Sequence, residues 1–70
     1  MKLSEKLKAL RTQCGYSKAY VARTIGVSTV SYWGYECNDV IPRAEKLIAL
    51  AKIYDTPLEE LVSCVMERND

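Results

Sequence analysis

The sequence predicts an all-α, compact domain of five short helices, in which the second and third helices form a helix-turn-helix unit. Three observations lead to this fold class. Apolar residues recur at helical spacing along most of the chain, residues 17–36 carry the start and stop signals of two short helices, and 49% of the 70 residues are apolar. A chain of this length holds a single small core. We therefore assign residues 1–70 to one domain, with a core over 3–62 and a helical extension or tail over 63–70.

The first helix is expected over residues 2–13. Leu3, Leu7 and Leu10 are spaced so that they fall on one face of a helix. Gly15 follows at the position where a left-handed residue commonly ends a helix.

The second helix is expected to begin after Ser17, whose hydroxyl oxygen can accept a hydrogen bond from a free backbone N–H of the first turn. Ala19, Ala22 and Ile25 recur at helical spacing, and we expect them to form its buried stripe. Gly26 provides a left-handed cap that allows a sharp turn.

The third helix is expected over residues 29–35, with Ser28 as its N-cap. Two helices joined by a three-residue turn with glycine are typical of a helix-turn-helix unit, whose second helix can enter the major groove of DNA. The helical register turns Tyr32 and Tyr35 inward. The residues left on the outer face are Thr29, Val30, Trp33 and Gly34.

The outer face of this third helix has few groups that could read bases. Thr29 offers a hydroxyl and a methyl group, and Val30 offers an apolar surface for a thymine methyl. No Arg, Lys, Asn or Gln occurs over residues 28–35, which excludes bidentate recognition of guanine or adenine from this helix. Any sequence preference then depends on van der Waals contact, water or DNA shape.

Two residues of the third helix leave alternatives open. Trp33 can contact DNA, lie in a protein interface, or fold back over the first helix. Gly34 either permits close approach to a backbone or a base, or ends the helix.

The fourth helix is expected over residues 43–54, with Pro42 at or near its first position. Its buried stripe is expected to consist of Ala44, Leu47, Ile48, Ala51 and Tyr54. For the fifth helix, Thr56, Pro57 and Glu59 match a capping box with proline at the first helical position.

The fifth helix has more apolar surface than a domain of this size needs. Leu58, Leu61, Val62 and Val65 supply its apolar face, which Cys64 and Met66 extend. A second copy of the chain is one partner for this surplus; the alternative is that residues 63–70 simply pack on the domain or fray. The residues expected in a dimer interface are Tyr54, Pro57, Val62, Val65 and Met66.

Across about residues 3–62 the sequence resembles the Cro and lambda-repressor (XRE-type) family of helix-turn-helix transcriptional regulators. The residues that carry the resemblance are Leu10-Arg11, Gly15-Tyr16-Ser17, Val21-Ala22, Ile25-Gly26-Val27-Ser28, Tyr35-Glu36, Pro42, Leu47, Leu50-Ala51, Tyr54 and Leu58-Glu59-Glu60-Leu61. The resemblance implies a lambda-repressor-like fold. It also implies an ion pair between Arg11 and Glu36 that joins the first helix to the third; the alternative is two solvated side chains.

The sequence departs from this family's pattern at three further positions. Lys18 stands where relatives usually have glutamine, which suggests a phosphate contact, although it can also be an ordinary surface lysine. Asn38 stands where glycine is frequent, and asparagine tolerates left-handed backbone. Asp39 replaces a usual positive charge, so that Arg43 is the only cation in this loop.

The composition excludes several functions. The chain contains no histidine and three widely spaced cysteines without a CxxC pair, so we expect no metal site, no disulfide framework and no enzyme. We expect the cysteines to be reduced thiols, with Cys14 and Cys64 partly filling the core. We expect no cofactor or small-molecule ligand, no membrane segment, and a cytoplasmic protein without a signal peptide.

Charge is distributed unevenly along the sequence. Residues 1–27 contain six Lys or Arg and one Glu, whereas residues 28–70 contain four Lys or Arg and eight acids. The domain could therefore present one basic face to phosphates, or the charges could mix on folding.

We conclude from the sequence that the chain is a sequence-specific regulator that binds double-stranded DNA, a small repressor of phage or mobile-element type acting as a homodimer on a palindromic site. Bases would be contacted by Thr29, Val30, Trp33 and Gly34. Phosphates would be contacted by Ser17, Lys18, Ser28, Asn38 and Arg43. The alternative is a protein-interaction or antitoxin-like module whose aromatic third helix contacts a protein.

Overall fold

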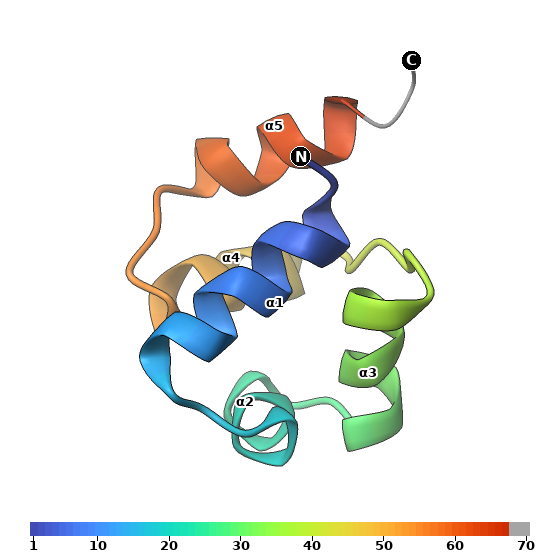
Figure 1. Ribbon diagram of the computed structural model, residues 1–70, viewed down its shortest axis with the longest axis vertical. Helices are drawn as coiled ribbons and strands as arrows, with labels where there is room; N and C mark the ends of the chain where they lie inside the picture. Colours follow the sequence, from blue (N-terminus) through green and yellow to red (C-terminus); the bar gives the residue numbers. More distant parts are fainter. Residues whose placement is uncertain (68–70) are drawn as a thin grey trace.

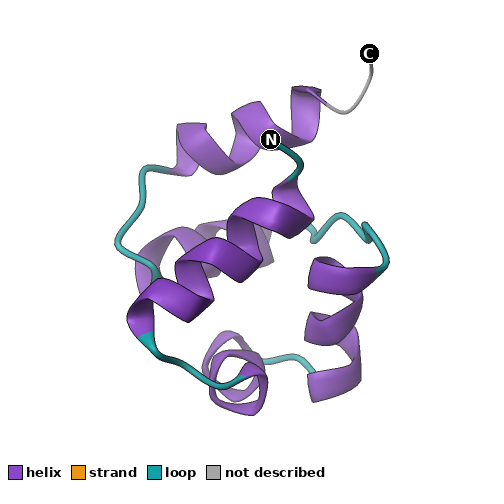
Figure 2. Ribbon diagram, in the orientation of Figure 1, coloured by secondary structure: helices purple, strands orange, loops and turns teal. Residues whose placement is uncertain are grey.

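The structure is a computed structural model in which residues 1–67 are described. Its helices are α1 (Leu3–Cys14), α2 (Lys18–Ile25), α3 (Thr29–Cys37), α4 (Ala44–Ile53) and α5 (Leu58–Glu67). The described part of the chain therefore has the predicted all-α architecture, and Figure 2 shows short loops between the helices. The expected extension over 63–70 is helical as far as Glu67, and residues 68–70 lie outside the described residues.

The helices surround one core, with α1 running through the middle of the view in Figure 1. Helix α1 packs against α3 and α5, α2 packs against α3 and α4, and α4 packs against α5. Helices α2 and α3 lie at one end of the molecule and α5 at the other (Figure 1). The helix-turn-helix unit is thus packed against α1, through α3, and against α4, through α2.

Every helix among residues 1–67 contributes a large, fully buried side chain to the core. These side chains are Leu7, Val21, Tyr32, Leu50 and Leu61. Each lies on the apolar face of its helix, so that the five helices meet on a common centre. Burial of such side chains is the main favourable term that holds a domain of this size together.

The predicted buried stripes need correction in α1, α2 and α4. Ala19 is exposed, and Val21 takes its place in the core. Ala19, Ala22 and Ile25 span about 120° around a helix, whereas Val21, Ala22 and Ile25 span about 100°, and the helix is rotated so that the narrower set faces the core. The observed stripe of α4 is Leu47, Leu50, Ala51 and Tyr54, at i, i+3, i+4 and i+7. Ala44 and Ile48, which were expected in this stripe, are exposed. Cys14 of α1, which was expected to fill part of the core, is exposed as well.

The predicted caps of the first three helices are present. Gly15 and Gly26 have φ of 74° and 82°, in the left-handed region that ends α1 and α2. The side-chain oxygens of Ser17 and Ser28 accept hydrogen bonds from the backbone N–H of Tyr20 and Ser31, both at 3.0 Å.

The expected starts of α4 and α5 were each misplaced. Arg43 is the N-cap of α4, so Pro42 precedes the helix by two residues instead of opening it. Helix α5 begins at Leu58, one residue later than expected, and the Thr56 hydroxyl donates to the Tyr54 carbonyl of the preceding turn, at 3.1 Å. A hydroxyl can bond to either neighbouring turn, and the sequence does not specify which.

Candidate nucleic-acid interface

The turn between α2 and α3 is closed from two sides. The backbone N–H of Val27 donates to the Ala22 carbonyl at 2.9 Å, which satisfies a free carbonyl at the end of α2. The Lys46 ammonium, from α4, donates to the Ile25 carbonyl at 3.0 Å. This cation also lies at the negative end of the α2 dipole, where it is favourable. The turn that sets the angle between α2 and α3 is therefore held by α4.

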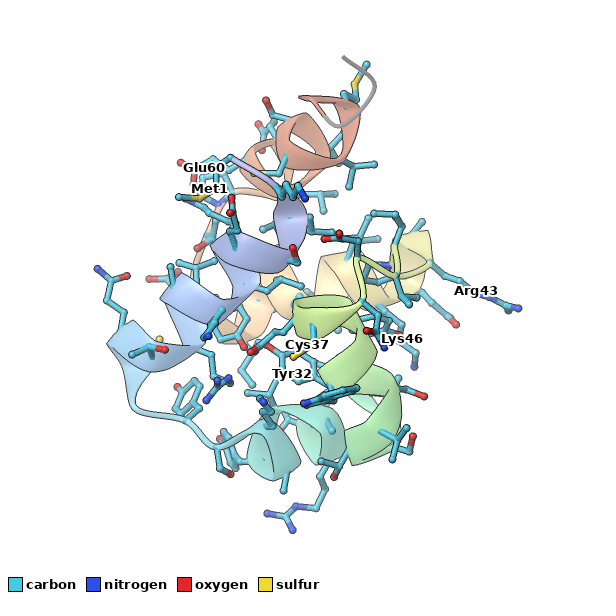
Figure 3. The ribbon with its side chains drawn as sticks, turned by 45° about the vertical axis from the view of Figure 1, so that its right-hand side comes forward. Met1, Tyr32, Cys37, Arg43, Lys46 and Glu60 are labelled. Carbon is cyan, nitrogen blue, oxygen red and sulfur yellow. The ribbon has the colours of Figure 1, made fainter. Side chains whose placement is uncertain are left out.

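The inner face of α3 is anchored by a buried hydrogen bond between two tyrosines. The hydroxyls of Tyr32 and Tyr54 are 2.6 Å apart, and Tyr32 lies within the body of the domain (Figure 3). Burial raises the pKa of both phenols, that of Tyr54 to about 12. Both side chains are thus neutral in the fold at ordinary pH. Because Tyr54 is buried in its own domain, the expectation that it lies in a dimer interface is wrong.

The C-terminal half of α3 is held to α1 by the ion pair expected between Arg11 and Glu36. Arg11 Nε donates to Glu36 Oε2 at 2.7 Å, and Arg11 Nη2 donates to Oε1 at 3.1 Å. The remaining nitrogen, Nη1, donates to the Tyr16 carbonyl at 3.0 Å. The alternative of two solvated side chains is excluded in this structure.

The opposite face of α3 projects into solvent. Val30 is 78% exposed, Trp33 is 44% exposed, and Thr29 is also exposed. We name Thr29, Val30 and Trp33 the outer face of α3. Its members belong to a helix whose other face is fixed by Tyr32 and Glu36, so their positions are well defined.

Gly34 does not belong to this outer face, contrary to the expectation from the helical register. It is buried beneath the loop that follows α3, where a Cβ on Gly34 would lie 3.5 Å from Cγ2 of Val40. Its carbonyl accepts hydrogen bonds from the N–H groups of Asn38 and Val40. The helix continues past Gly34 to Cys37, so the residue does not end it either. The close approach that Gly34 permits is to its own chain.

The loop after α3 also differs from expectation. Asn38 has φ of −117°, and the left-handed residue is Asp39, with φ of 55°. The Ser4 hydroxyl donates to Asp39 Oδ1 at 2.7 Å, and the Lys2 ammonium lies 3.7 Å from Oδ2. These contacts hold Asp39 against α1. Arg43 extends away from the domain, as Figure 3 shows.

The candidate phosphate contacts lie near the ends of the helices. Ser17, Ser28, Asn38 and Arg43 are exposed, and Lys18 is partly exposed. The Ser28 hydroxyl already donates to Ser31 Oγ at 3.0 Å. The Lys18 ammonium lies over the ring of Trp33, 6.0 Å from its centroid, so Trp33 faces α2 as well as solvent.

Folding cancels part of the charge asymmetry seen in the sequence. Lys2, Lys6 and Arg11 from the basic first half pair with Asp39, Glu60 and Glu36 from the acidic second half. Among residues 1–67, Lys8, Lys18 and Arg23 form no ion pair. The positive charge that remains to bind a phosphate is therefore carried by a few unpaired side chains of this part of the chain.

Several residues that position this interface were not identified from the sequence. Lys46 bonds to the end of α2, the Tyr54 hydroxyl bonds to Tyr32 within α3, and Ser4 bonds to the loop at Asp39, and each of these partners is distant in sequence. Such contacts depend on which helices pack together, so no local pattern indicates them. Within residues 1–67 no group of acidic and cysteine side chains is arranged to hold a metal ion, and no helix of that part is long and apolar enough to cross a bilayer.

Comparison with known proteins identifies the family to which the chain belongs. A helix-turn-helix family model matches residues 7–61. The transcriptional repressor RstR of the cryptic phage CTXphi, from Vibrio cholerae, is 38% identical over 60 residues, which are 86% of this chain and 54% of that protein. The transcriptional regulator AnsR of Bacillus subtilis is 34% identical over 58 residues, which are 83% of this chain and 50% of AnsR. The chain thus spans about half the length of these relatives.

A solved structure with the same fold is the P22 c2 repressor in complex with a synthetic operator. The TM-score is 0.81 at 26% sequence identity, over 87% of this chain and 92% of that chain. Residues 1–67 therefore form a compact domain of five helices with the lambda-repressor-like fold. It belongs to the helix-turn-helix family of transcriptional regulators, which is a family of regulators and not of enzymes.

Proposed function

We propose that this chain is a repressor of phage or mobile-element type that binds a palindromic double-stranded operator as a homodimer. The observation that carries the proposal is the contrast between the two faces of α3. One face is fixed by Tyr32 and Glu36, and the other presents Thr29, Val30 and Trp33 to solvent. A rigid helix with an exposed outer face is what insertion into a major groove requires.

The outer face of α3 would read bases by shape and apolar contact. Val30 is the most exposed of the large apolar residues and suits a thymine methyl, while the Thr29 hydroxyl can donate or accept. Lys18 and Arg43, with the neutral donors of Ser17, Ser28 and Asn38, would hold phosphates on either side. The P22 c2 repressor was solved with a synthetic operator, and its likeness to this chain supports operator binding.

The homodimer is proposed through α5. Val62 and Met66 are exposed there, Val65 is partly buried, and Pro57 is exposed just before the helix. Leu58 and Ile48 extend this apolar surface, and a shallow groove lined by both residues lies between α4 and α5. Two copies related by a two-fold axis would bury the surface and place two α3 helices for two half-sites.

A binding-site selection from random duplexes tests the proposal, with untagged protein at moderate salt. An enriched inverted repeat is the expected result, and its spacing gives the distance between the two α3 helices. Repeating the selection with Val30→Ala should relax the preference at one position of each half-site. Val30→Ile, which keeps an apolar side chain, is the matched control.

The alternative function is protein binding through α3. The absence of Arg, Lys, Asn and Gln over residues 28–35 and the exposed ring of Trp33 favour it. If folded, dimeric protein enriches no duplex, the operator proposal is wrong and the outer face of α3 is assigned to a protein partner.

A further inference from the structure

Lys18 and Trp33 meet on the side of the molecule that the proposed function assigns to DNA. Lys18 opens α2 and Trp33 lies in the middle of α3, so their contact spans the two helices of the unit. The Lys18 ammonium is 6.0 Å from the ring centroid, at the outer limit of the range in which a ring face attracts a cation. No carboxylate of residues 1–67 forms an ion pair with Lys18.

Helix α2 by itself disfavours a cation at this place. The N-terminal end of a helix carries a partial positive charge, which repels the ammonium of Lys18 at the first helical position. The electron-rich face of the Trp33 indole offsets part of this repulsion without neutralising the charge. The ammonium therefore stays available for an external anion.

The ring also limits the freedom of a long side chain. A lysine on an open surface spreads its ammonium over many rotamers, and this freedom is lost when the lysine binds a phosphate. Trp33 is half-buried and belongs to the fixed helix α3, so it can hold the ammonium near one place. A preorganised cation loses less entropy on binding.

We propose that Trp33 is a positioning residue for Lys18: its ring holds the ammonium at the start of α2 so that it meets a phosphodiester oxygen of the bound duplex. This inference rests on the proposed function and adds a role for Trp33 beyond contact with a base. It predicts that part of the contribution of Trp33 to DNA affinity depends on the presence of Lys18.

A double-mutant cycle measures that part. Affinity for a labelled duplex carrying the selected site is determined for wild type, Trp33→Leu, Lys18→Gln and the double variant. The loss of affinity caused by Trp33→Leu should be about two- to fivefold larger in the protein that has Lys18 than in the Lys18→Gln background. This is the factor expected for an exposed cation–ring contact. Trp33→Phe, which keeps a ring face, should retain part of the coupling.

Two controls separate positioning from structural damage. Lys8→Gln removes an equal charge from α1, and the effect of Trp33→Leu should be the same with or without it. Thermal melts establish that each variant is folded; Trp33→Phe preserves an aromatic side chain if Trp33→Leu lowers stability.

The outcomes are distinct. If wild-type protein binds no duplex, the proposed function and this inference both fail. If wild-type protein binds but Trp33→Leu has equal effects with Lys18 and in the Lys18→Gln background, Trp33 acts independently of Lys18 and only the inference is overturned.

Discussion

Arg11 and Glu36 form a two-point hydrogen-bonded ion pair across the α1–α3 contact. The Nε–Oε2 and Nη2–Oε1 distances are 2.7 and 3.1 Å, and the Glu36 side chain is fully buried. The hydrogen bond with Glu36 raises the pKa of Arg11, so the arginine is charged at every pH at which the domain is folded. The pair sets the C-terminal half of α3 against α1 and so fixes the angle of its outer face.

Arg11→Met should therefore destabilise the domain strongly. It leaves the buried Glu36 without its partner, and loss of one member of such a pair costs about 3–5 kcal/mol. Urea unfolding at neutral pH measures the change. Lys6→Met is the matched control on the same helix, because the Lys6–Glu60 pair lies at the surface, with Lys6 partly exposed and Glu60 exposed, and should contribute less than about 1 kcal/mol. An unchanged midpoint for Arg11→Met would contradict the role assigned to the pair.

Stability should fall at alkaline pH because of Tyr32 and Tyr54. Both phenols have a raised pKa in the fold, about 12 for Tyr54, against about 10 in an unfolded chain. Below pH 10 both states keep the protons and stability is unaffected. Between about pH 10 and 12 the unfolded state loses protons that the folded state retains, so the free energy of unfolding decreases with pH.

The slope of that decrease is measured by urea midpoints over this pH interval. Each tyrosine contributes at most about 1.4 kcal/mol per pH unit. Tyr54→Phe removes one of the two groups and should make the slope shallower, although it lowers stability at neutral pH by breaking the hydroxyl pair. The same slope in both proteins would argue against this origin.

Two glycines should respond to alanine in opposite directions. Gly34→Ala adds a methyl group at ordinary contact distance from Val40 within a helix, and should stabilise the domain by about 1 kcal/mol through helix propensity. Gly26→Ala forces a side chain into left-handed backbone and should destabilise it by about 1–2 kcal/mol. Thermal melts give both values. Gly34→Ala should also leave DNA affinity unchanged, and a large loss would return Gly34 to the base-contacting surface.

The dependence of DNA affinity on salt should be shallow. With two phosphate-contacting cations assigned per monomer, Lys18 and Arg43, log affinity against log salt should have a slope of about −4 for a dimer. Ion pairs among residues 1–67 leave few of their cations unpaired, which supports this low number. Titrations at several salt concentrations measure the slope; a value as steep as −10 would require cations that we have not assigned.

Charge on the exposed face of α5 should separate the proposed dimer. Val62→Glu with Met66→Glu places two carboxylates on side chains that are exposed in the single domain, so the fold should be unaffected. Sedimentation should show a dimer for wild type and a monomer for the variant. Thr12→Glu on α1 is the control and should remain dimeric. A wild-type protein that is monomeric when bound to its operator would contradict the homodimer.

The elements of the fold could be predicted from local signals, whereas part of the candidate site could not. Ser17, Gly26 and Ser28 predicted the two helices and their turn, because a cap is satisfied by neighbours in sequence. The placement of Gly34 was wrong because its burial depends on how the loop at Val40 folds back over α3. The expected core role of Ala19 was wrong because apolar spacing leaves the rotation of a short helix open.

The sequence by itself determined the all-α class, the helix-turn-helix unit and the exposure of Thr29 and Val30, since these follow from helical period and capping within a few residues. Only the tertiary structure decided how α3 is held. The bonds from Lys46 to Ile25 and between the hydroxyls of Tyr32 and Tyr54 join residues about twenty positions apart. Their partners meet only when the five helices pack on one core, because a side chain's hydrogen-bond partner is set by distance in space.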